Sequence, residues 1–141
     1  MSYLPWAILA LLAYSLVPPL MSVATTGSVR MPSNVAALFA NTILVIGTVL
    51  IVVYNRSEAL TYVSHPTFKY VALAGIFLTV GILAYYRALA RGPVSVVTPI
   101  FGMFLVTSSI VGIAALGEAP TPRKLLGIAL AVVAIALVSI E

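Results

Sequence analysis

Seven polar side chains lie within long apolar stretches of the sequence, where they could bind a small polar molecule. They carry hydroxyl, phenol or amide groups, and they are Tyr14, Ser15, Asn41, Thr42, Thr79, Tyr85 and Ser108. Such groups donate and accept hydrogen bonds and are uncharged at neutral pH. In an apolar environment each needs a hydrogen-bonding partner, because an unpaired polar group there is costly. The pattern predicts solute contacts, with hydrogen bonding between helices as the alternative, foremost for Asn41.

The titratable residues do not fit an enzyme. The sequence has one histidine, no cysteine and three acidic residues, which are all glutamate. His65 precedes Pro66 in a turn-like segment, so we expect it to lie in a solvated loop. No catalytic triad, metal cluster or phosphate-binding loop can be assembled from these residues. We therefore expect no catalysis, no metal ion and no cofactor.

The composition predicts a protein of the cell membrane. Of the 141 residues, 62% are hydrophobic and 7% are charged, whereas soluble domains have about 25% charged residues. The neutral runs 1–29, 31–55 and 92–117 exceed the about 20 residues that cross a bilayer. The runs 70–86 and 125–140 are shorter, but flanking lysine and arginine side chains can extend them to the interfaces. The basic residues are scattered at helix ends, which indicates membrane anchors and no nucleic-acid partner.

These runs predict an all-α, polytopic fold in one domain, 1–141. Its five transmembrane helices are expected at 3–24, 33–54, 68–90, 94–117 and 122–140. We expect Ser33 or Asn34 to cap the second helix, and Thr121 to cap the fifth with Pro122 at its first position.

Prolines interrupt two of the predicted helices. Pro18 and Pro19 have no amide hydrogen, so the carbonyl groups of Tyr14 and Ser15 lose their helical donors near the middle of the first span. Those carbonyls either bond to a neighbouring helix or water at a kink, or line a wet cavity as broken transporter helices do. The other candidate hinge positions are Gly92, Pro93 and Pro99.

A few residues at helix ends and on the last helix have separate predicted roles. Arg87 and Arg91 share a helical face and serve either as headgroup anchors or as an anion-binding pair. Glu118, at a helix end, is a second candidate for a charged contact. The small side chains of the last helix that share a face predict a dimer contact, and they are Gly127, Ala131 and Ala134.

The segment from Tyr85 to the last residue resembles the C-terminal part of an EamA repeat of the drug/metabolite transporter superfamily. The resemblance rests on aromatic and small residues before Gly92, then on Ser95, Val97, Pro99, Gly117, Glu118 and Gly127. It covers residues 85–141, while the first half is similar in layout alone. The resemblance implies a polytopic carrier of small solutes, with alternating access to a cavity lined mainly by the first four helices.

The sequence departs from the typical member of that family, which contains two repeats inverted relative to each other. Because the sequence holds one repeat, we expect a partner to supply the other half. The first helix also lacks the glutamate with which the four-helix multidrug members of the superfamily couple to protons, so the resemblance supplies no proton-coupling residue there.

The distribution of basic residues bears on orientation. Five spans would place four basic residues on one side of the membrane (Arg56, Lys69, Arg123 and Lys124) and three on the other (Arg30, Arg87 and Arg91). A four-to-three split gives almost no preference for one orientation. We therefore predict dual topology and an antiparallel homodimer that transports small solutes through the lipid bilayer. The alternatives are a non-transporting membrane subunit and a half-transporter that pairs with a different chain.

Overall fold

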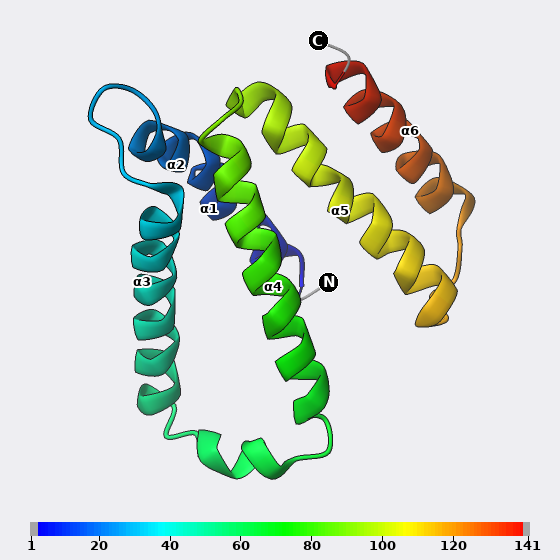
Figure 1. Cartoon of the computed structure of the whole chain (residues 1–141). Coiled ribbons are helices and arrows are strands. Elements are labelled where there is room, and N and C mark those ends of the chain that lie inside the picture. The colour runs from blue at the N-terminus through cyan, green and yellow to red at the C-terminus, as the bar shows by residue number, and fades with distance from the viewer. Residues whose placement is uncertain (1–2, 140–141) are drawn as a thin grey trace. The chain divides into compact units, whose positions relative to one another are not determined.

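Every regular element in residues 3–139, the part of the chain that the computed structural model describes, is a helix (Figure 1). The all-α prediction is confirmed. The chain divides into two units, Met1–Arg91 and Gly92–Glu141. The first unit holds α1, α2, α3, a 3-10 helix η1 and α4, and the second holds α5 and α6.

The first apolar run forms two helices that meet at Leu16. These are α1 (Leu4–Ser15) and α2 (Val17–Thr25). Pro18 and Pro19 lie in the first turn of α2, where a proline causes no loss of a helical hydrogen bond within α2. The amide of Leu20 donates to the carbonyl of Leu16 at 3.3 Å, which starts the new helix. Together the two helices form a stretch of 22 residues that is long and apolar enough to cross a membrane.

The rest of the first unit is an antiparallel pair of long helices. The chain descends through α3 (Ser33–Tyr54), turns at η1 (Ala59–Ser64) and returns through α4 (Phe68–Leu89) (Figure 1). Helix α2 contacts both α3 and α4. Most buried residues gather where α2 and α4 end and α3 begins, and they are Met21, Thr25, Ala36, Ala37, Tyr85, Tyr86 and Leu89; Pro18, in the first turn of α2, is buried as well. The small side chains of Ala36 and Ala37 permit close helix packing at this end.

Most large apolar side chains are exposed, as the composition requires of a lipid-facing surface. Ile43 is 72% exposed and Phe77 is 68% exposed, although both lie in the middle of long helices. A water-soluble protein rarely exposes such continuous apolar surface. In a bilayer the same surface contacts lipid tails.

The second unit is a helical hairpin of α5 (Val94–Ala115) and α6 (Pro122–Val138). Pro93 precedes α5 in an extended conformation, and α5 continues through Pro99. The link between the helices passes through Gly117, whose φ of 70° favours glycine. The hydroxyl of Thr121 accepts a hydrogen bond from the Lys124 amide at 3.3 Å. The predicted cap of the last helix is thus confirmed.

Two sequence expectations differ from the structure. No side chain caps α3, because its cap position is occupied by Pro32, so the predicted cap at Ser33 or Asn34 is wrong. Four described helical stretches are long and apolar enough to span a membrane. Helix α6 has 17 residues, fewer than the about 20 needed, and its predicted end at residue 140 lies outside the described residues. The fifth span stays a prediction.

Candidate functional site

The hydroxyl groups near the middle of the spans in the first unit bond to their own helices. A serine or threonine hydroxyl that donates to a preceding carbonyl satisfies its hydrogen, yet its oxygen can still accept. The three bonds, each of 2.8 Å, run from Ser15 to Leu12, from Thr42 to Leu38 and from Thr79 to Gly75. These groups therefore present acceptor oxygens rather than donors.

The amide of Asn41 adds a further acceptor. Its Nδ2 atom donates to the carbonyl of Ala37 at 2.8 Å, and the side chain is half-buried. Ala37 is in the core of the unit, with 1% of its surface exposed. In the described part of the chain the Asn41 amide makes no hydrogen bond to another helix. The oxygen of the amide is thus available beside the core.

An aromatic cluster lies at the end of the unit where α4 ends. Tyr85 and Tyr86 are buried, and their ring centroids are 6.0 Å apart with an angle of 34° between the planes. Tyr14, beside the break at Leu16, is exposed. The sequence analysis did not include Tyr86 among the candidate site residues, although its position next to Tyr85 indicated a second phenol at the same place.

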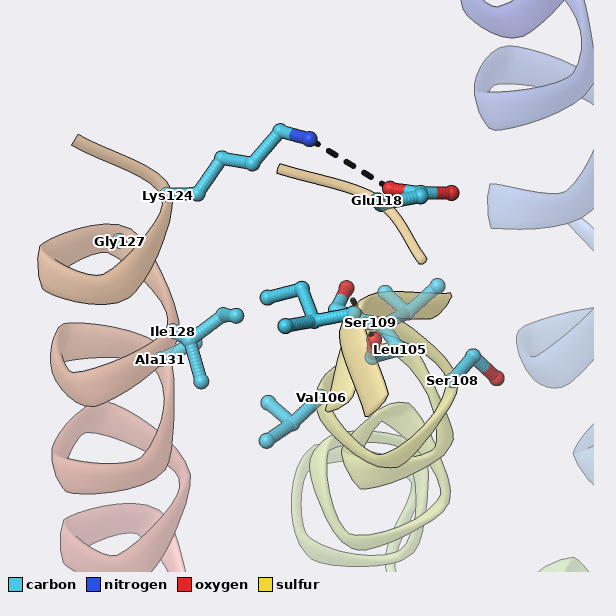
Figure 2. Close-up of a pocket in the computed structure, with 10 residues that line it drawn as sticks. Leu105, Val106, Ser108, Ser109, Glu118, Lys124, Gly127, Ile128 and Ala131 are labelled. Atoms are coloured by element: carbon cyan, nitrogen blue, oxygen red, sulfur yellow. Dashed lines mark hydrogen bonds and ion pairs between the residues drawn. The ribbon is translucent and has the colours of Figure 1, made fainter. Parts of the chain in front are cut away.

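The second unit contains a cavity of about 570 Å³ between α5 and α6 (Figure 2). Its lining includes residues to which the sequence analysis gave three different roles: solute contact, charged contact and dimer packing. Those residues are Ser108, Glu118, Gly127 and Ala131. Ala134, the third predicted dimer residue, is exposed and is not part of this lining.

Glu118 is held at the edge of this cavity by three interactions. Its Oε2 atom lies 3.4 Å from Lys124 Nζ, and its amide donates to the carbonyl of Gly112 at 3.1 Å. Its carboxylate also packs against Gly112, where a Cβ atom would approach Oε1 to 3.1 Å. Both side chains of the ion pair are about half exposed. The sequence analysis missed Lys124 and Gly112, although two opposite charges flanking one short link were a signal for the pair.

The two adjacent serines of α5 differ in their hydrogen bonding. Ser109 Oγ donates to the carbonyl of Leu105 at 2.8 Å. The hydroxyl of Ser108 has no hydrogen-bonding partner in the described residues and is turned away from α6 (Figure 2). Gly127 and Ala131 line the cavity from the α6 side. Ser108 therefore keeps both its donor and its acceptor available.

The arginines at the end of α4 are arranged differently from the predicted pair. Arg87 lies in the last turn of α4, where a cation complements the helix dipole. Arg91 lines a cavity of the first unit together with Arg30, and Arg87 is not part of that lining. The spacing of four residues indicated a shared face for Arg87 and Arg91. It could not reveal that Arg91 lines a cavity together with Arg30, which lies 61 positions earlier in the chain.

Comparison with known proteins identifies the family. The model of the EamA-like transporter family matches residues 1–140, nearly the whole chain. No curated protein and no solved structure matched the sequence. The family match and the four apolar helices show a multi-pass integral membrane protein of the drug/metabolite transporter type. The chain belongs to the EamA-like transporter family.

Proposed function

We propose that this protein carries small solutes that bear hydrogen-bond donors. The observation that supports this substrate class is the set of acceptor oxygens near the middle of the spans. The hydroxyl hydrogens of Ser15, Thr42 and Thr79 are already bonded to backbone carbonyls. A solute with ammonium, amine or hydroxyl donors satisfies the oxygens that remain, whereas a carboxylate finds few donors.

The proposed binding residues comprise these three, together with Tyr14, Asn41, Tyr85 and Ser108. Because Tyr85 is 6% exposed, its contact with a solute requires movement of the neighbouring helices. The break at Leu16 beside Pro18 and Pro19, the Gly92–Pro93 link and Pro99 are the proposed hinges for that movement. Alternating access through such broken helices is a common transporter mechanism.

The working unit is proposed to be an antiparallel homodimer. Inverting a copy across the bilayer leaves its mid-span residues at the same depth, so two copies would present their polar side chains at one level. The nearly equal numbers of basic residues on the two predicted sides support insertion in both orientations. The small residues of α6, Gly127, Ala131 and Ala134, are the proposed contact between copies.

Uptake into proteoliposomes tests the function. Vesicles with the reconstituted full chain should accumulate labelled ethanolamine above protein-free vesicles, and succinate much less. Asn41→Leu, Thr79→Val and Tyr14→Phe should each lower uptake about fivefold, since each removes a hydrogen-bonding group. Chemical crosslinking should show that the dimer is retained.

Thr61→Val is the matched control, because Thr61 also bonds to a backbone carbonyl, that of Glu58, but lies in η1. Its uptake should equal that of the wild type. Uptake that is unchanged in Asn41→Leu and Thr79→Val would remove both residues from the site. A chain that moves no solute and copurifies in fixed ratio with a foreign protein would indicate a subunit or a half-transporter.

A further inference from the structure

A second cavity, of about 340 Å³, lies in the first unit where three helices end or begin. Its lining includes Thr25 at the end of α2, Arg30 in the following link, Ser33 at the start of α3, and Ala90 and Arg91 after α4. Two arginines from distant parts of the chain thus line one small cavity.

In the described residues no carboxylate pairs with the two arginines that line this cavity. Within the described residues the side chains of Arg30 and Arg91 have no ion pair and no hydrogen bond, while the backbone amide of Arg91 donates to the carbonyl of Ala88. The sole carboxylate side chain in residues 1–91 is that of Glu58. It follows the far end of α3, a helix of 22 residues and therefore about 33 Å long. Both arginines are exposed, so they are accessible to an anion from outside the unit.

The neighbouring backbone also favours an anion. Pro32 precedes α3 without any side-chain cap, and the amide of Ser33 has no acceptor in the described part of the chain. The side chain of Thr25 is not free to serve as a donor, because its hydroxyl bonds to the carbonyl of Met21 at 2.7 Å. The two arginines therefore provide the main attraction, and the helix terminus adds to it.

The depth of the cavity indicates the kind of anion. The ends of membrane-spanning helices lie at the level of the lipid headgroups, and each lining residue named above is within a few positions of such an end. Arginine binds phosphate through two parallel N–H···O bonds. We propose that Arg30 and Arg91 form a binding site for a phosphate group at the membrane interface, carried by an anionic lipid or by a soluble phosphate compound.

Equilibrium binding to the detergent-solubilised full chain tests the site. The probe is tritiated dioleoyl phosphatidylglycerol in micelles that contain excess phosphatidylcholine, measured by scintillation proximity. We expect saturable binding of one lipid per chain. Arg30→Gln and Arg91→Gln should each weaken this binding about tenfold or more, because each removes a charged hydrogen-bonding partner. Arg87→Gln and Arg56→Gln are the controls, and each should stay within about twofold of the wild type.

A competition arm identifies the source of the phosphate. If inorganic phosphate displaces the lipid, or if phosphate alone protects the wild type but not Arg30→Gln against thermal unfolding, the natural ligand is a soluble phosphate compound. If phosphate has neither effect while the lipid binds, the ligand is the lipid headgroup. Equal losses in all four arginine variants, or no saturable binding of either probe, would overturn the proposal.

Folding of the variants is checked by circular dichroism and gel filtration. Where a glutamine variant does not fold, Arg30→Lys and Arg91→Lys take its place. Lysine keeps the charge but lacks the paired donors of arginine. These variants should bind the lipid more weakly than the wild type, and binding equal to that of the wild type would contradict the site.

Discussion

The carboxylate of Glu118 rests on Gly112, so that a Cβ atom at position 112 would lie 3.1 Å from Glu118 Oε1. A small substituent can be accepted if the half-exposed carboxylate moves by a few tenths of an ångström. A large one must push the carboxylate away from Lys124. Position 112 therefore controls where this negative charge lies at the edge of the cavity.

The ion pair itself should contribute little to stability. Both side chains are about half exposed, and the charged atoms are 3.4 Å apart. Exposed pairs of this kind contribute about 0.2 to 1 kcal/mol and weaken as salt is added. A double-mutant cycle of Glu118→Gln and Lys124→Met, measured by equilibrium unfolding in mixed micelles, should give a coupling energy in that range. A coupling above about 2 kcal/mol that does not change with salt would show that the pair is buried in the bilayer.

Replacement of Gly112 should change how much Glu118 contributes to the free energy of unfolding. Gly112→Leu is expected to displace the carboxylate, so adding Glu118→Gln to it should change the unfolding free energy by less than about 0.5 kcal/mol. Gly81→Leu is a control, because a Cβ at Gly81 meets no atom within 4 Å. If Glu118→Gln has the same effect with glycine or leucine at position 112, the two residues are independent.

The break in the first span should limit its stability and permit its movement. Pro19→Ala restores an amide that can donate to the carbonyl of Ser15 and so extend one helix through Leu16. The variant should be more stable by about 1 kcal/mol and should transport more slowly. Pro5→Ala is the control, since Pro5 lies in the first turn of α1 and interrupts no helical bond. Faster transport by the Pro19→Ala variant would contradict a hinge at this position.

Whether α6 crosses the bilayer can be measured without knowing the orientation of the chain. The chain has no cysteine, so cysteines can be placed together at Ala119 and Ser139, on either side of α6. If α6 spans the membrane, an impermeant maleimide reagent applied to intact cells labels one of the two sites in each molecule. A gel that counts attached polyethylene glycol–maleimide groups should show single additions. Doubly labelled molecules would show that α6 does not cross.

Local sequence signals predicted much of the fold. Neutral runs bounded by charges indicated the long helices, since burying a charge in hydrocarbon is costly. The Thr121–Pro122 pair predicted the start of α6, because a hydroxyl cap and a proline at the first position both act within one turn. The predicted cap of α3 was wrong because Ser33 already lies inside that helix, after Pro32, and no side chain caps it.

Relations between distant residues could not be predicted in the same way. The cavity shared by Arg30 and Arg91 depends on how α2, α3 and α4 pack, which no short motif encodes. The packing of Glu118 on Gly112 depends likewise on the path of the link through Gly117. The structure shows that the mid-span hydroxyls of Thr42 and Thr79 donate to backbone carbonyls. Their oxygens are therefore acceptors, which the sequence alone did not indicate.

Labelling of single cysteines tests the antiparallel dimer most directly. Suitable exposed positions are Ser28, Ser57 and Ala119, whereas Thr121 is less suitable because its side chain caps α6. Intact cells are treated with an impermeant maleimide, and the remaining thiols are counted after lysis. The proposal of two orientations predicts that every site is labelled in about half of the molecules. Full labelling of Ser57 and Ala119 with none of Ser28, or the reverse, would contradict the antiparallel homodimer.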